Sequence, residues 1–121
     1  MKYLLLLTLL LSTSAFARIS QSGAVQVALE EMQREGGSHF GTDSWKDYLD
    51  ITTVVSKKEY KKMLKISSKN GNTDFSDFLT QYPYSENFYV NVEVSDCVIQ
   101  WILYVVNKSS GKLVDQISDQ E

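Results

Sequence analysis

The chain has 121 residues, of which 43% are hydrophobic and 22% are charged, and its net charge at neutral pH is -3. This length suits one small domain with a single modest core rather than two domains. The acidic balance argues against nucleic acid as a partner, because phosphate backbones attract basic surfaces.

The first 17 residues have the pattern of a secretory signal peptide. Lys2 supplies the positive start, residues 3–11 are almost unbroken leucine, and Ala15 and Ala17 fit the small positions of a cleavage site. The apolar run is about half the roughly 20 residues that span a bilayer, so no stable membrane anchor is expected. We predict a signal peptide over residues 1–17, one α+β domain over residues 18–121, and secretion, with a bacterial periplasm favoured over a eukaryotic secreted protein.

Residues 18–34 are predicted to form an amphipathic helix. Ser20 or Ser22 can cap its start, and a Gly-Gly pair at 36–37 ends it. Its apolar residues recur at spacings of three and four and are Ala24, Val25, Ala28, Leu29 and Met32. A helix of this length has little stability alone, so the apolar stripe is expected to lie on a sheet formed by the end of the chain.

The middle of the chain, residues 38–87, is predicted to be mainly helical. Ser44 can cap a short helix, and the β-branched residues 51–55 indicate a strand. Ser56 and Glu59 then have the spacing of a capping box, before a helix with an apolar edge of Tyr60, Met63 and Leu64.

That helix is expected to fray by Ser67 and Ser68. Asn70 and Gly71 have turn chemistry, Asp74 can cap one more short helix, and Pro83 stops it. A β-hairpin around Asn70 is the competing interpretation.

The last third of the chain is predicted to be an antiparallel meander. Residues 88–94 alternate, with one apolar face and one wet face made of Tyr89, Asn91 and Glu93. Residues 97–106 are apolar on both parities and indicate a central strand with Trp101 in the core. Gly111 provides a turn before a return strand over 113–117. The predicted fold is α+β, with the N-terminal helix packed on this C-terminal sheet and a helical insertion in the middle.

Two stretches resemble the PepSY-type domain of secreted bacterial proteins. Residues 19–28, ISQSGAVQVA, are similar to its Ser-capped first helix, and residues 104–114, YVVNKSSGKLV, are similar to its closing strand, turn and strand. Asn107 stands where the family commonly has an acidic residue, and Ser110 stands where Thr is common. The resemblance implies a cystatin-like topology and a non-enzymatic secreted module that binds or inhibits other proteins.

No catalytic, cofactor or metal constellation is found in the sequence, so we expect no enzyme activity and no cofactor. His39 is the only histidine and has no partner at ligand spacing, so it is interpreted as an ordinary loop residue. Cys97 is the only cysteine, which excludes an internal disulfide. It is interpreted as a small buried residue, with an exposed thiol that forms an intermolecular disulfide as the alternative.

Two features of the middle segment are candidates for partner binding. The first is a basic stripe at helical spacing, which consists of Lys58, Lys62, Lys65 and Lys69. It could be a solvated helix face, or it could dock an acidic partner or anionic headgroups. The second is the aromatic loop of Tyr82 and Tyr84, which could belong to the core or anchor a protein contact.

The leading functional hypothesis is a periplasmic protein-binding module, for which an inhibitor or an immunity protein that neutralises an effector enzyme is the concrete candidate. The alternative is a binder of a small ligand or envelope component, with a cystatin-like cavity between helix and sheet. An enzyme of unknown type is the third hypothesis.

Overall fold

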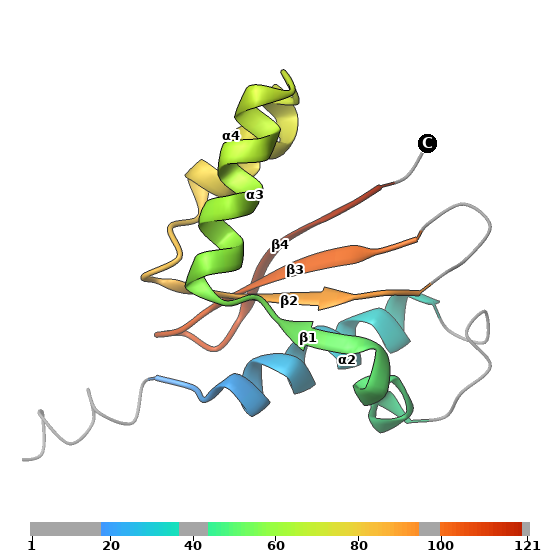
Figure 1. Ribbon diagram of the computed structural model, residues 1–121. Helices are drawn as coiled ribbons and strands as arrows, with labels where there is room; N and C mark the ends of the chain where they lie inside the picture. The colour runs from blue at the N-terminus through green and yellow to red at the C-terminus, as the bar shows by residue number, and fades with distance from the viewer. Residues whose placement is uncertain (1–17, 37–43, 95–99, 120–121) are drawn as a thin grey trace, which may run out of the picture.

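The computed structural model describes residues 18–36, 44–94 and 100–119 (Figure 1). Along the chain, the elements are α2 (Gln21–Gly36), the 3-10 helix η2 (Trp45–Ile51), β1 (Thr52–Val54), α3 (Lys57–Lys69), α4 (Thr73–Gln81), β2 (Asn87–Val92), β3 (Ile102–Asn107) and β4 (Leu113–Ser118). The strands form one antiparallel sheet in the order β1-β2-β3-β4. The predicted α+β fold, with an N-terminal helix on an antiparallel meander and a helical insertion in the middle, is confirmed.

The fold has three layers, with the sheet between α2 and the hairpin of helices α3 and α4 (Figure 1). The two faces of the sheet separate two clusters of buried side chains. Val90, Val92 and Tyr104 pack with α2 on one face, whereas Tyr89 and Leu103 pack with the α3–α4 hairpin on the other. Because alternate residues of a strand point to opposite faces, β2 and β3 are covered on both sides near their middles.

Helix α2 packs on the sheet as its periodicity predicts. The Ser20 hydroxyl accepts a hydrogen bond from the Gly23 amide at 3.1 Å and so caps the start. Ala24, Ala28, Leu29 and Met32 are all buried in the first cluster. The two alanines let the helix backbone lie close to the strands.

The turn between β3 and β4 is tied to the start of α2. Gly111 has a φ of +69°, as expected for this turn, and a Cβ at this position would lie 2.7 Å from Ile19 Cγ2. The Ile19 amide donates to the Lys108 carbonyl at 3.0 Å. Any larger residue at Gly111 would therefore strain the turn and displace the beginning of α2.

The α3–α4 hairpin differs from the sequence predictions at the end of α3 and at the cap of α4, and it excludes the competing β-hairpin. The capping box of Ser56 and Glu59 is present in both directions, but α3 continues past Ser67 to Lys69. Ser67 is buried and donates to the Leu64 carbonyl at 3.1 Å, so the last turn does not fray. Asn72, and not Asp74, caps α4, through a 3.2 Å hydrogen bond from the Phe75 amide. The turn at Gly71, with a φ of +75°, joins two helices and not two strands.

The strand face that alternation predicts to be wet is buried at Tyr89 and becomes exposed towards Glu93. Tyr89 is 0% exposed and lies beneath the helical hairpin, whereas Asn91 is half-buried and Glu93 is exposed. The prediction of an exposed Tyr89 is therefore wrong, because the α3–α4 excursion returns over this end of the sheet.

The start of the central strand is also corrected. β3 begins at Ile102, and its burial on both faces confirms it as the central strand. Trp101 precedes the strand and is only half-buried, at the margin of the second cluster. The amides of Gln100 and Trp101 donate to Asp119 Oδ1 at 2.8 and 3.0 Å instead of to a neighbouring strand. The core position predicted for Trp101 is wrong, because its ring packs against Phe75 but also lines an open hollow beside the sheet.

Replacement of Leu29 by alanine should destabilise the protein. Leu29 is 0% exposed between α2 and the sheet, so we expect the change to lower the free energy of unfolding by about 2 to 5 kcal/mol. Leu49 in η2 is 47% exposed and serves as the matched control, for which we expect less than about 0.5 kcal/mol. Urea denaturation measures both; equal losses would contradict the packing of α2.

Stability should fall at alkaline pH partly through Tyr104. Burial raises the pKa of its hydroxyl, and the carboxylates of Glu35 and Glu31 raise it further. In the unfolded chain, the Tyr104 hydroxyl ionises at about pH 10. The stabilisation that neutral Tyr104 contributes is therefore fully present below this pH. It is lost as the pH rises towards the folded-state pKa.

We expect the free energy of unfolding to fall more steeply above about pH 10 in the wild type than in Tyr104→Phe. Urea titrations at about pH 8 and about pH 11 test this difference. Parallel losses in the two proteins would show that Tyr104 is not the group that titrates.

Candidate functional site

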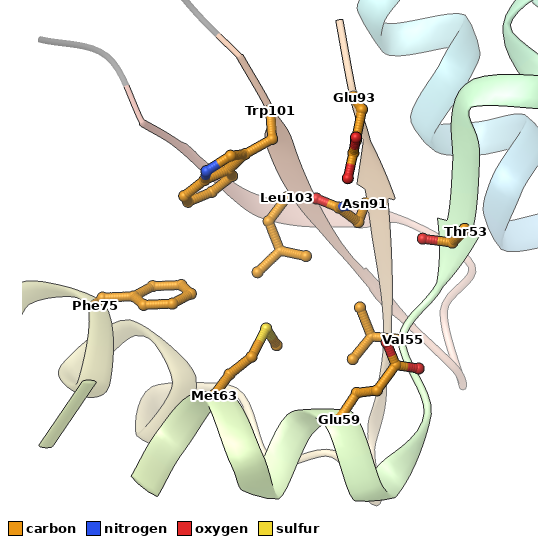
Figure 2. Close-up of a pocket in the computed structure, with 9 residues that line it drawn as sticks. All are labelled: Thr53, Val55, Glu59, Met63, Phe75, Asn91, Glu93, Trp101 and Leu103. Atoms are coloured by element: carbon orange, nitrogen blue, oxygen red, sulfur yellow. The ribbon is translucent and has the colours of Figure 1, made fainter. Parts of the chain in front are cut away.

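A hollow of about 300 Å³ opens between the α3–α4 hairpin and the sheet. Figure 2 shows the side chains around it, which come from both helices and from three strands or their ends. They are Thr53, Val55, Glu59, Met63, Phe75, Asn91, Glu93, Trp101 and Leu103. A space of this volume is at the small end of the range in which proteins hold ligands.

The hollow exists because the hairpin covers only one end of the sheet. At that end, the Tyr60 and Tyr89 rings pack with centroids 5.3 Å apart. The Tyr60 hydroxyl donates to the Leu79 carbonyl at 2.5 Å. From there α3 and α4 rise steeply away from the sheet (Figure 1), so Leu103 and Asn91 of the strands line an open space beside the helices.

One side of the hollow is apolar. The rings of Phe75 and Trp101 lie 5.8 Å apart between centroids, with their planes tilted by 42°. Met63 and Leu103 form the adjoining surface (Figure 2). These residues offer two aromatic surfaces and a polarisable thioether, which suit an aliphatic stem or a flat cation.

The other side is polar and acidic. Glu59 and Glu93 are exposed, and the paired strand residues Thr53 of β1 and Asn91 of β2 line the same side (Figure 2). The Glu59 carboxylate also accepts a hydrogen bond from the Ser56 amide at 3.2 Å, which fixes it at the start of α3. Among the residues that the structure describes, no lysine, arginine or histidine lines the hollow.

A second hollow, of about 360 Å³, continues from the first past β1. Asp50, Ile51, Thr53 and Glu93 line it, so the two share Thr53 and Glu93. Together they form an elongated depression with three carboxylates, here called the acidic groove. Its charge attracts cations, and its apolar end can bury the rest of a cationic group.

The lysine row of Lys58, Lys62, Lys65 and Lys69 lies along the exposed side of α3. The opposite side of this helix carries the buried Tyr60 and Ser67. Within the described parts of the chain, the one ion pair joins Arg34 to Glu31, so the lysine row has no acidic partner there. Its ammonium groups face solvent.

The predicted aromatic loop is part of the fold. The Tyr82 hydroxyl donates to Asp115 Oδ2 at 2.7 Å, and the Tyr84 hydroxyl donates to the Val55 carbonyl at 2.8 Å. The ring centroids of Tyr84 and Tyr60 lie 5.4 Å apart. Lys108 Nζ lies 5.3 Å from the centroid of the Tyr84 ring. Both tyrosines are half-buried against the second cluster, so the structure does not bring them together with the lysine row.

His39 and Cys97 lie outside the described residues, and so does the predicted signal peptide. Among residues 18–36, 44–94 and 100–119, no group of three potential ligands could hold a metal ion. None of the described helices is both long enough and apolar enough to cross a bilayer.

The sequence pattern does not predict the acidic groove. It indicates only a cap for Glu59, a wet strand face for Glu93 and a core position for Trp101. One signal is present in the sequence. Alternate residues of β2 share one face of the strand, and on one of these faces the aromatic Tyr89 is followed by the polar Asn91. Such a change marks where the cover over a sheet ends.

Comparison of the chain with protein-family models, with curated proteins and with solved structures gave no match.

The hydrogen bond between Tyr82 and Asp115 should couple the hairpin to β4. The hydrogen bond to Asp115 is the largest cause of the raised pKa of the Tyr82 hydroxyl, and burial raises this pKa further. In a double-mutant cycle of Tyr82→Phe and Asp115→Ala, we expect a coupling of about 0.5 to 2 kcal/mol in the free energy of unfolding. Additive effects in urea denaturation would contradict a structural role for this pair.

Proposed function

We propose that this protein is a secreted, periplasmic, non-enzymatic module that binds another protein through the lysine row and so inhibits or neutralises it. The observation that carries the proposal is the exposure of four lysines, without acidic partners in the described chain, along one side of a capped helix. The complementary surface is an acidic patch on the partner. An immunity protein acting on an effector enzyme fits this description.

The charge distribution supports this proposal. The sequence of α3 contains six lysines and one glutamate, although the whole chain has a net charge of -3. Basic residues concentrated on one element of an acidic protein create a local field that orients an approaching acidic surface. Such a field raises the association rate and discriminates against basic partners.

The way α3 is anchored favours a protein partner over a membrane. Tyr60, Met63 and Leu64, which form the apolar edge of the helix, all pack in the second cluster. An interfacial helix would need that apolar edge for the lipid. The lysine row is therefore presented by a helix whose other side is already used.

A second candidate function is the binding of a small ligand in the hollow beside Trp101. The observation that favours it is the volume of about 300 Å³ with mixed apolar and acidic lining. This space lies on the opposite face of the sheet from α2, and not under the N-terminal helix as a cystatin-like arrangement had suggested.

Neutralising the lysine row should slow association with the partner. Affinity capture from a periplasmic extract, with mass spectrometry, would identify that protein, and binding kinetics would then be measured on the purified pair. For Lys58→Gln, Lys62→Gln and Lys65→Gln combined, we expect association to be roughly threefold to tenfold slower at low salt, with a weaker salt dependence.

The matched control combines Arg18→Gln, Lys46→Gln and Lys112→Gln, which remove the same charge from exposed positions outside α3. We expect it to associate at nearly the wild-type rate. If both triple variants slowed association equally, net charge and not the lysine row would be responsible, and the proposed contact surface would be wrong.

A further inference from the structure

We propose that the acidic groove binds an extended polypeptide segment through one arginine side chain. This site differs from the lysine row in position and in sign of charge, and it does not depend on the function proposed for that row. It is built from the hollow between Trp101 and Glu93 and its continuation towards Asp50.

Charge complementarity selects a cationic occupant. Three carboxylates, those of Glu59, Glu93 and Asp50, line the two hollows, and no basic side chain of residues 18–36, 44–94 or 100–119 does. Of the exposed acids, Glu59 is held in place by its capping hydrogen bond, so part of the site is ordered before any ligand arrives. A neutral or anionic occupant would leave these charges without a partner.

The apolar end favours arginine among cations. Figure 2 shows Phe75 and Trp101 on one side of the hollow, with Glu59 and Glu93 on the other. A guanidinium group is flat, stacks on aromatic rings and is weakly hydrated, so it can lie between a ring and a carboxylate. The aliphatic stem of arginine then contacts Met63 and Leu103, which form the adjoining surface.

The shape of the groove favours a chain segment over a free ion. The first hollow, of about 300 Å³, is joined through Thr53 and Glu93 to the second, of about 360 Å³. The second hollow lies beside β1, which is at the edge of the sheet. An extended segment can place its arginine in the first hollow and continue past Thr53 into the second.

The test uses the peptide acetyl-Gly-Ser-Arg-Ser-Gly-amide and the same peptide with citrulline, which keeps the shape of arginine but has no charge. Nuclear magnetic resonance reports binding at the indole of Trp101. Trp45 is an internal reference, because it packs with α2 in the first cluster on the other face of the sheet. We expect the arginine peptide to shift the Trp101 signal at millimolar concentration and to leave the Trp45 signal unchanged.

Glu93→Gln should lower the affinity for the arginine peptide by roughly twofold to fivefold, as expected for an exposed charge pair. Glu86→Gln removes the same charge from an exposed position that does not line the groove, and it should bind like the wild type. The triple lysine variant should also bind this peptide like the wild type, which separates this proposal from the preceding one.

Three results would overturn the proposal. The first is an unshifted Trp101 signal in the wild type, and the second is equal binding of the citrulline peptide. The third is binding of N-acetylarginine amide as tight as that of the peptide, which would make the groove a site for small cations and not for a chain segment.

Discussion

The contact of Tyr89 with the helical hairpin is the constraint on which the second layer depends. Its side chain leaves β2 beneath the hairpin, is 0% exposed, and packs against the ring of Tyr60. Its hydroxyl donates to the Tyr82 carbonyl, just after α4 ends. A buried hydroxyl without a partner would cost stability, so this bond fixes where the hairpin lies on the sheet. Burial also raises the pKa of Tyr89, which keeps the hydroxyl protonated as a donor.

Anchoring at one end determines the shape at the other. Helices α3 and α4 pack mainly on each other. Their ends farthest from the sheet rise away from it and leave part of this sheet face uncovered (Figure 1). Phe75 and Trp101 meet across this gap, and the sheet beneath changes from Tyr89 to Asn91 and Glu93. The acidic groove is thus a consequence of two local features, namely an early anchor and a polar end of one strand face.

Much of the fold could be predicted from the sequence because its elements have strong local signals. The alanines of α2, the capping box at Ser56 and the doubly apolar β3 all specify the structures observed. The errors arose where tertiary contacts decide. Tyr89 fits a wet strand face by alternation alone, and only the return of a distant hairpin buries it. For the same reason the groove could not be predicted, since its residues come from six elements or their ends and no single sequence motif contains them.

The hairpin separates two surfaces of opposite charge. Because Tyr60 and Ser67 are buried, helical periodicity places the lysine row on the solvent side of α3, while Glu59, at the beginning of the same helix, faces the groove. The lysines therefore do not neutralise the carboxylates of the groove, and neither group is paired with the other. Moving the helix by one residue would rotate it by about 100° and mix the two charges. The capping box and the Tyr60 hydroxyl bond, which fix that rotation, are what keep the two surfaces separate.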